Sequence, residues 1–235
     1  MIEKIAVIAD IHANKYALDE FLKYINNKNI KCVLNLGDFV QIGPNPYEVS
    51  TRIINDKRFI NILGNNETSL FEINNRDESD ENLHRLWTRE KIYENFEKIK
   101  SFPKKNIINK GDFKILMIHS RKNDIKGMPL IYNDNLDAFV KDYEEFNSDI
   151  VLFGHTHEKL YIEHNKKIFI NPGSLGCSKN GTIDFVVLKI HNDKKLEVDF
   201  KALKYDKKEL INDYSKNNVP DKKFLLKTFF NYDVK

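Results

Sequence analysis

Three short apolar runs near the N-terminus, separated by amphipathic segments, constrain the fold of this chain more than any other feature. The runs are Ile5–Ala9, Cys32–Leu36 and Phe59–Leu63. Between the first two, Asn14 can cap a helix. The apolar side chains that follow it recur at helical spacing, at Leu18, Phe21, Leu22 and Ile25. With a second, shorter helix near Tyr47–Asn55, this order predicts parallel strands joined by crossover helices.

In the rest of the chain, most of the predicted strands are joined by short turns and pair as hairpins. A hairpin is expected where Asn106–Ile108 and Phe113–Ile118 flank a turn that contains Gly111. The further elements predicted are a helical region over roughly Glu81–Ser101, a helix near Asn135–Phe146, a strand at Ile150–Phe153, hairpins at Leu160–Ile170 and Phe185–Phe200, and two helices after them. The mixture predicts an α/β fold with two mixed sheets and helices outside them.

Polar side chains of a particular kind follow five of the predicted strands. They are Asp10 and His12, Asp38, Asn65, His119, and His155 with His157. Because the carboxyl ends of strands in α/β sheets are where sites are built, we expect these side chains to lie together. Carboxylate, imidazole and amide oxygen suit Mn, Fe, Zn, Co or Ni better than Ca²⁺ or a thiolate cluster. Seven such groups exceed the needs of one tetrahedral ion and fit two ions that share a carboxylate, an arrangement used for phosphoryl transfer.

The composition limits the other function classes. With 235 residues, the chain is interpreted as one domain over residues 1–235. A net charge of +3 with scattered lysine pairs does not favour nucleic acid as a partner. Two cysteines, no apolar run long enough to span a bilayer and no signal-peptide pattern at the start favour a cytoplasmic protein.

The motifs in their order resemble those of the calcineurin-like metallophosphoesterases, and within them the compact bacterial and archaeal phosphodiesterase branch. The resemblance rests on Asp10-Ile11-His12, Gly37-Asp38, Gly64-Asn65-Asn66-Glu67, His119, Gly154-His155-Thr156-His157 and Asn171-Pro172-Gly173-Ser174. It implies the metallo-dependent phosphatase fold, a four-layer α/β/β/α sandwich with two mixed sheets. It also implies hydrolysis of a small phosphoester, a phosphodiester rather than a monoester, by attack of a metal-bridging hydroxide.

The resemblance further implies a role for each site residue. Asp10, His12 and His157 would bind one divalent transition-metal ion. The second ion would be bound by Asn65, His119 and His155, with Asp38 bridging both. Mn²⁺ is the favoured metal, and Fe, Zn, Co and Ni also suit the ligands.

One position departs from the family pattern. Many members have His directly after the metal-binding Asn, where it stabilises the transition state or protonates the leaving group, and here that residue is Asn66. An amide can donate a hydrogen bond to a phosphate oxygen but cannot deliver a proton. His84, on the following helix, could replace the missing acid, although an ordinary histidine at the edge of the core is the preferred interpretation.

Two alternatives to the enzyme stay open. One is a non-catalytic metal-binding scaffold, as in the retromer subunit built on this fold, and the other is a nuclease. All seven ligand positions carry competent residue types, which favours an enzyme over a scaffold. The loop Ser120–Leu130, expected on the leaving-group side, carries no recognisable specificity code, and the sequence predicts no oligomeric state.

Overall fold

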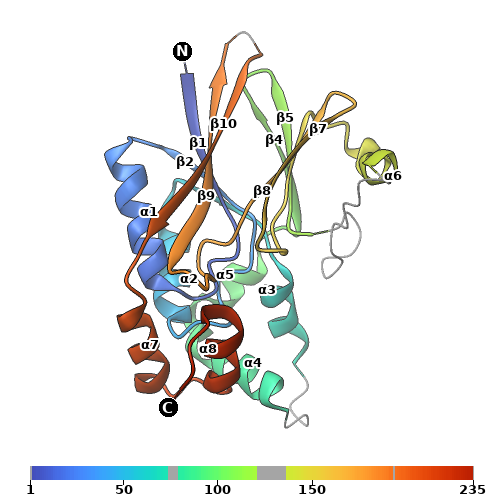
Figure 1. Cartoon of the computed structure of the whole chain (residues 1–235). Coiled ribbons are helices and arrows are strands. Elements are labelled where there is room, and N and C mark those ends of the chain that lie inside the picture. The colour runs from blue at the N-terminus through green and yellow to red at the C-terminus, as the bar shows by residue number, and fades with distance from the viewer. Residues whose placement is uncertain (1, 74–78, 121–135, 193, 235) are drawn as a thin grey trace.

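The structure is a computed structural model that describes residues 2–73, 79–120, 136–192 and 194–234. Two five-stranded sheets form its centre (Figure 1). Sheet A has the strand order β10-β9-β1-β2-β3, and sheet B has the order β4-β5-β6-β8-β7. The strands are β1 (Ile2–Ile8), β2 (Cys32–Asn35), β3 (Phe59–Asn61), β4 (Lys105–Lys110), β5 (Phe113–Ile118), β6 (Ile150–Leu152), β7 (Lys159–His164), β8 (Lys167–Pro172), β9 (Thr182–His191) and β10 (Leu196–Lys204).

The pairing confirms the parallel arrangement expected for the first three strands. In sheet A, β1 and β3 both run parallel to β2, and β9 pairs antiparallel with β1 and β10. In sheet B, β6 runs parallel to β5 and β8, while β4 and β7 form antiparallel hairpins with their neighbours. Both sheets are therefore mixed, as predicted.

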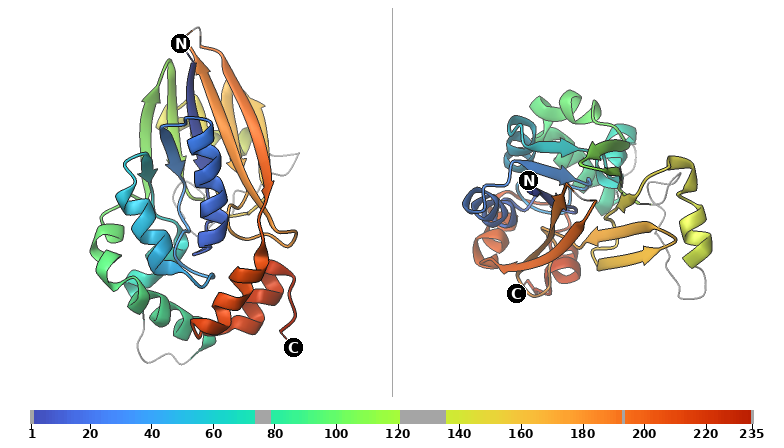
Figure 2. Two further views of the ribbon diagram at one scale, coloured as in Figure 1. Left: turned by 90° about the vertical axis from the view of Figure 1, so that its left-hand side faces the viewer. Right: turned by 90° about the horizontal axis from the view of Figure 1, so that it is seen from above.

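Helices cover the outer faces of the two sheets (Figure 2). They are α1 (Lys15–Asn27), α2 (Pro46–Asn55), α3 (Asn65–Ser69), α4 (Asp80–Lys91), α5 (Phe96–Lys100), α6 (Leu136–Lys141), α7 (Lys207–Lys216) and α8 (Lys222–Phe230), with 3-10 turns η1 (Leu70–Glu72), η2 (Tyr93–Asn95) and η4 (Glu144–Phe146). α1 begins at the predicted cap, where Asn14 Oδ1 accepts the N–H of Ala17 at 3.0 Å. None of the described helices is long and apolar enough to cross a bilayer.

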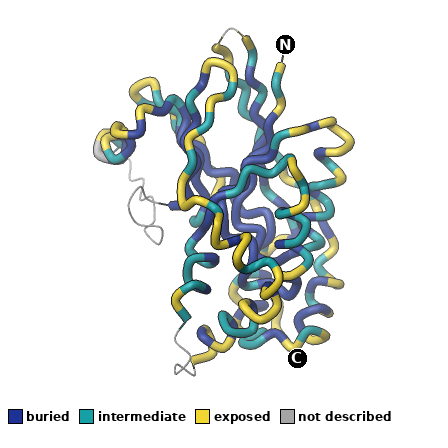
Figure 3. The backbone as a smooth tube through the Cα atoms, turned by 180° about the vertical axis from the view of Figure 1, so that it is seen from behind, coloured by how far each residue is buried: buried dark blue, intermediate teal, exposed yellow. Residues whose placement is uncertain are grey.

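Alternation along the strands divides the buried side chains among three layers. Ile5 and Val7 point between the sheets, where they join Ile115 and Met117 of β5 in the central cluster. The neighbouring side chains of β1 point outward and pack under the helices of sheet A. A third cluster packs α6 on the outer face of sheet B. Figure 3 shows the buried residues concentrated in these layers, and the predicted α/β/β/α sandwich is confirmed.

The helical region expected over Glu81–Ser101 is confirmed, and it consists of two helices, α4 and α5, separated by η2. The side chain of Asn95 donates to the hydroxyls of Ser50 at 2.9 Å and Thr51 at 2.8 Å on α2, and these bonds hold the chain in the turn between α4 and α5. The helix expected near Asn135–Phe146 is α6 followed by η4, and its first residue lies outside the described residues, as do residues 121–130 of the loop Ser120–Leu130.

Candidate metal centre

Loops at the ends of the central strands fix the main chain of the site. The N–H of Asp10 donates to Gly37 O, and the N–H of His12 donates to Asp38 O, both at 3.0 Å. The turn after β8 packs onto the same loop, because the N–H of Gly176 and the hydroxyl of Ser174 both donate to Asp10 O, at 2.9 and 2.8 Å. Loops from three strand ends are thus held in one rigid unit.

Five of the predicted ligands have strained backbone conformations. Asp10, His12, Asp38, His155 and His157 all have positive φ, between 48° and 72°. Such conformations cost L-residues roughly 1–3 kcal/mol each and persist where the surrounding structure imposes them, which is typical of functional sites.

One triad of side chains combines Asp10, His12 and His157. Nε2 of His12 lies 2.9 Å from Nε2 of His157, and Asp10 Oδ1 lies 3.7 and 3.5 Å from these two nitrogens. Metal bonds of about 2.0–2.2 Å place neighbouring ligand atoms roughly 3–3.5 Å apart, so the triad has the spacing of a cation site. Asp10 Oδ1 is buried and has no hydrogen-bond partner among the described residues, and a cation would satisfy it.

A second group combines Asp38, Asn65, His119 and His155. Nε2 of His119 lies 3.2 Å from Asp38 Oδ2 and 3.1 Å from Asn65 Oδ1. The ring of His155 packs edge-on against that of His119, with the ring centroids 5.3 Å apart. A ring nitrogen of each and a carboxylate oxygen of Asp38 lie within 4.8 Å of one another. On the far side, Nδ1–H of His119 donates to Leu36 O at 2.7 Å, which leaves Nε2 free to bind a metal.

Asp38 connects the two groups. Its carboxylate, Asp10 and His12 offer ligand atoms that lie within 4.8 Å of one another, while its Oδ2 contacts His119. The structure thus brings all seven predicted ligands into one cluster, with Asp38 between the two halves. Nitrogen and oxygen donors of this kind fit a pair of divalent transition-metal ions.

The charges in the cluster are strongly coupled. Burial opposes ionisation of Asp10 and Asp38, but the neighbouring histidines outweigh it and lower the pKa of both carboxyls. Burial and the charge of His157 hold the pKa of His12 well below its usual range. Burial opposes protonation of His119, yet Asp38 and Asp10 raise its pKa to about 10. The two acids are therefore ionised. Without a metal ion, the proton on His119 balances part of their charge, and a cation bound at its Nε2 would take the place of that proton.

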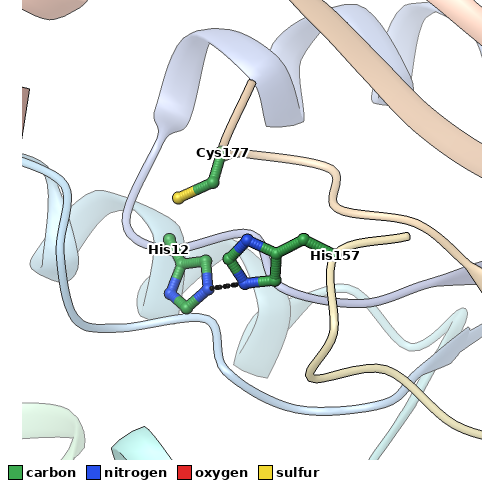
Figure 4. Close-up of side chains that lie close together, drawn as sticks. All are labelled: His12, His157 and Cys177. Carbon is green, nitrogen blue, oxygen red and sulfur yellow. Dashed lines mark hydrogen bonds between the residues drawn. The ribbon is translucent and has the colours of Figure 1, made fainter. Parts of the chain in front are cut away.

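Two residues with no assigned sequence role take part in the site. Glu67 is fully buried and accepts the backbone N–H groups of Asp38, Phe39, Val40 and Gly64 at 2.7–3.2 Å. Its place in the Gly64–Glu67 motif was a signal for this role. Cys177, after the Asn171–Ser174 turn, is buried, and its sulfur lies within 4.8 Å of ring nitrogens of His12 and His157 (Figure 4).

Asn66 and His84 differ in their relation to the cluster. Asn66 Nδ2 lies 3.2 Å from Nδ1 of His12, and its N–H donates to Asp38 Oδ1 at 2.8 Å, so Asn66 belongs to the site. His84 is buried on α4, where its Nε2 accepts the N–H of Ile42 at 3.0 Å. Burial lowers the pKa of His84 to about 4, so the ring is neutral near pH 7. The hydrogen bond from Ile42 uses the ring to hold a loop, in agreement with the structural interpretation.

Residues 4–193 match the family model of the calcineurin-like phosphoesterase superfamily domain. The chain belongs to this superfamily. Over 92% of its length it is 29% identical to the uncharacterized protein MJ0912 of Methanocaldococcus jannaschii, of which the match covers 94%. The fold is similar to that of a metallophosphoesterase from Sphaerobacter thermophilus, with TM-score 0.76, 21% identity and coverage of 97% of this chain and 98% of that one. It is also similar to that of an archaeal phosphodiesterase, with TM-score 0.51, 22% identity and coverage of 85% and 99%.

Proposed function

We propose that this chain is a cytoplasmic, single-domain phosphoesterase that binds two divalent metal ions and acts on a small phosphodiester. Membership of the superfamily supports a phosphoester hydrolase. One observation carries the finer proposal: Asp38 lies between the Asp10–His12–His157 triad and the group formed by Asn65, His119 and His155. A carboxylate in that position can be shared by two ions.

Each residue has a definite task in this proposal. Asp10, His12 and His157 hold one ion, while Asn65, His119 and His155 hold the other, with Asp38 shared. When bound, such ions generate hydroxide from water and stabilise the charge on a phosphoryl group. Mn²⁺ is the ion we favour, because the donors are oxygen and imidazole nitrogen.

Asn66 is the residue that we propose contacts the substrate. Its amide stands beside His12 and can donate a hydrogen bond to a phosphoryl oxygen. The amide of Asn66 cannot protonate the leaving group, and Nε2 of His84 accepts the N–H of Ile42. This favours substrates whose leaving groups need little help, and a diester with an activated ester group is the first to test.

The test compares the chelated protein with the protein reconstituted with Mn²⁺, using bis(p-nitrophenyl) phosphate as the diester. We expect hydrolysis that requires the metal and is lost in Asp38→Asn. Two bound ions without hydrolysis of any monoester, diester or cyclic nucleotide would support the scaffold alternative. Cleavage of oligonucleotides in preference to small diesters would support the nuclease.

A further inference from the structure

The C-terminal helices α7 and α8 lie beyond the residues that match the family, yet they are attached to the loops of the metal centre. The hydroxyl of Tyr214 donates to Ile42 O at 3.1 Å, and Asn217 Nδ2 donates to Pro44 O at 2.8 Å. Asp213 accepts from Asn45 Nδ2 at 2.8 Å. These bonds fix α7 against the segment that follows Asp38, at the end of the molecule where α8 also lies (Figure 1).

α8 brings one aromatic ring to the metal centre. The ring centroid of Phe229 lies 6.4 Å from that of His12 and 6.3 Å from that of His157, at interplanar angles of 34° and 46°. Phe229 therefore lies beside two of the three members of the Asp10 triad. The side chain of His157 is 26% exposed, so this is a side of the cluster that solvent can reach.

Phe229 is not the residue that holds α8 in place. Leu225, Leu226 and Phe230 are buried in the core, and the ring of Phe230 packs against Tyr214 at 6.0 Å. Phe229 is only partly buried at the edge of this core. Part of the Phe229 ring is therefore open to solvent, and the ring lies beside His12 and His157.

We infer that Phe229 is a specificity-determining residue that packs against a flat aromatic group of the substrate, either a nucleobase or an aryl ester. The inference rests on the proposed function, which puts the phosphoryl group at the metal ions beside His12 and His157. The packing of one aromatic ring on another gives a binding preference of up to about tenfold beyond the effect of the buried area. An aliphatic or sugar group would gain less from the same surface.

The experiment measures binding rather than turnover. The affinities of phenylphosphonate and methylphosphonate for the Mn²⁺-loaded protein are compared by calorimetry in wild type, Phe229→Leu, Phe229→Ala and Phe224→Ala. Phe224 is the matched control, because it lies on α8 and is 58% exposed. We expect wild type to bind phenylphosphonate up to about tenfold more tightly than methylphosphonate. Both Phe229 variants should lose most of this preference, while Phe224→Ala keeps it.

A second pair of ligands separates the two sources of an aromatic ring. If the natural ring is a nucleobase, adenosine 5′-phosphate should bind more tightly than ribose 5-phosphate, and Phe229→Leu should remove the difference. If only the phenylphosphonate preference depends on Phe229, the ring is an aryl ester.

The results of this experiment and of the activity assay are independent. A phenyl preference that is equal in all four proteins, or no phosphonate binding at all, overturns the inference even if the protein hydrolyses diesters. A preference that depends on Phe229 in a protein that hydrolyses nothing supports the aromatic site and counts against the proposed function. Phe229→Leu keeps most of the apolar volume, so the comparison survives if Phe229→Ala fails to fold.

Discussion

Glu67 accepts the backbone N–H of Asp38 at 2.8 Å, so a buried acid outside the ligand set fixes the main chain of the shared carboxylate. Burial and the charge of Asp38 raise the pKa of Glu67 to about 7, although its backbone N–H partners act in the opposite direction. The same carboxylate accepts the N–H of Gly64, directly before Asn65. Glu67 thereby sets the distance between the loops of β2 and β3.

Glu67→Gln should destabilise the protein and weaken the second metal site. The substitution puts an NH₂ group against backbone N–H donors, and an unsatisfied buried group costs about 1–3 kcal/mol. Urea unfolding of the chelated protein measures the stability, and metal titration measures the site. Glu72→Gln is the control, because Glu72 is exposed on η1. Equal stability of Glu67→Gln and wild type would contradict this role.

Removal of Asp38 and of Asp10 should have different effects on the metal content. Asp38→Ala removes a ligand that we propose is shared, so both ions should be lost on dialysis. Asp10→Ala removes a ligand of one triad, so the other ion should be retained. Elemental analysis of the dialysed proteins measures the number of metal ions bound per chain in each variant. Two tightly held ions in Asp38→Ala would exclude a bridging role.

Asn66→His should increase hydrolysis most for substrates with poor leaving groups. General acid catalysis by a positioned side chain is worth about 10²–10⁴-fold, and its benefit grows as the leaving group becomes more basic. The measurement is the ratio of nitrophenyl to alkyl ester hydrolysis, which should fall in the variant. His84→Ala should leave this ratio unchanged, since His84 accepts the N–H of Ile42 and is neutral. A selective loss of alkyl ester hydrolysis in His84→Ala would show that His84 supplies the proton.

His84 should make the stability of the fold sensitive to acid. Burial lowers its pKa from 6.5 to about 4, so between these values the unfolded chain binds a proton that the folded protein does not. The free energy of unfolding therefore has its full value with respect to this group above pH 6.5. It falls by up to about 3 kcal/mol as the pH falls toward 4. His84→Gln keeps an acceptor for the N–H of Ile42 without titrating. Urea unfolding in the presence of a chelator, at pH 7.5 and 5, should show a smaller loss in this variant than in wild type, and equal losses would contradict the assignment.

Binding of a metal ion should protect Cys177 from alkylation. Its sulfur lies within 4.8 Å of ring nitrogens of His12 and His157, so an ion at those nitrogens reduces access to the thiol. Mass spectrometry of the protein alkylated with and without Mn²⁺ should show protection of Cys177 and no change at Cys32, which lies at the start of β2. Burial raises the pKa of the Cys177 thiol, so the reaction is run until the metal-free protein is modified, and equal modification of Cys177 in both samples would then place the ion elsewhere.

The sequence by itself determined the parallel direction of β1, β2 and β3 and the edge at which the site forms. Apolar runs with crossover spacing require parallel strands, and parallel strands bring their carboxyl ends to one edge. That rule predicts that Asp10, Asp38 and Asn65 lie together at this edge. These features depend on neighbours along the chain, which a sequence pattern can report.

Only the tertiary structure decided which distant segments complete the site. Asn14 donates to Tyr205 Oη across 191 residues, and the turn that holds Cys177 packs on the Asp10 loop. Separate elements also meet where Phe229 packs beside His12 and His157. Two hydrogen bonds do the same: Ile42 N–H donates to His84, and His119 Nδ1–H donates to Leu36 O. Such contacts depend on how the layers pack side chain against side chain, and no local periodicity encodes that packing.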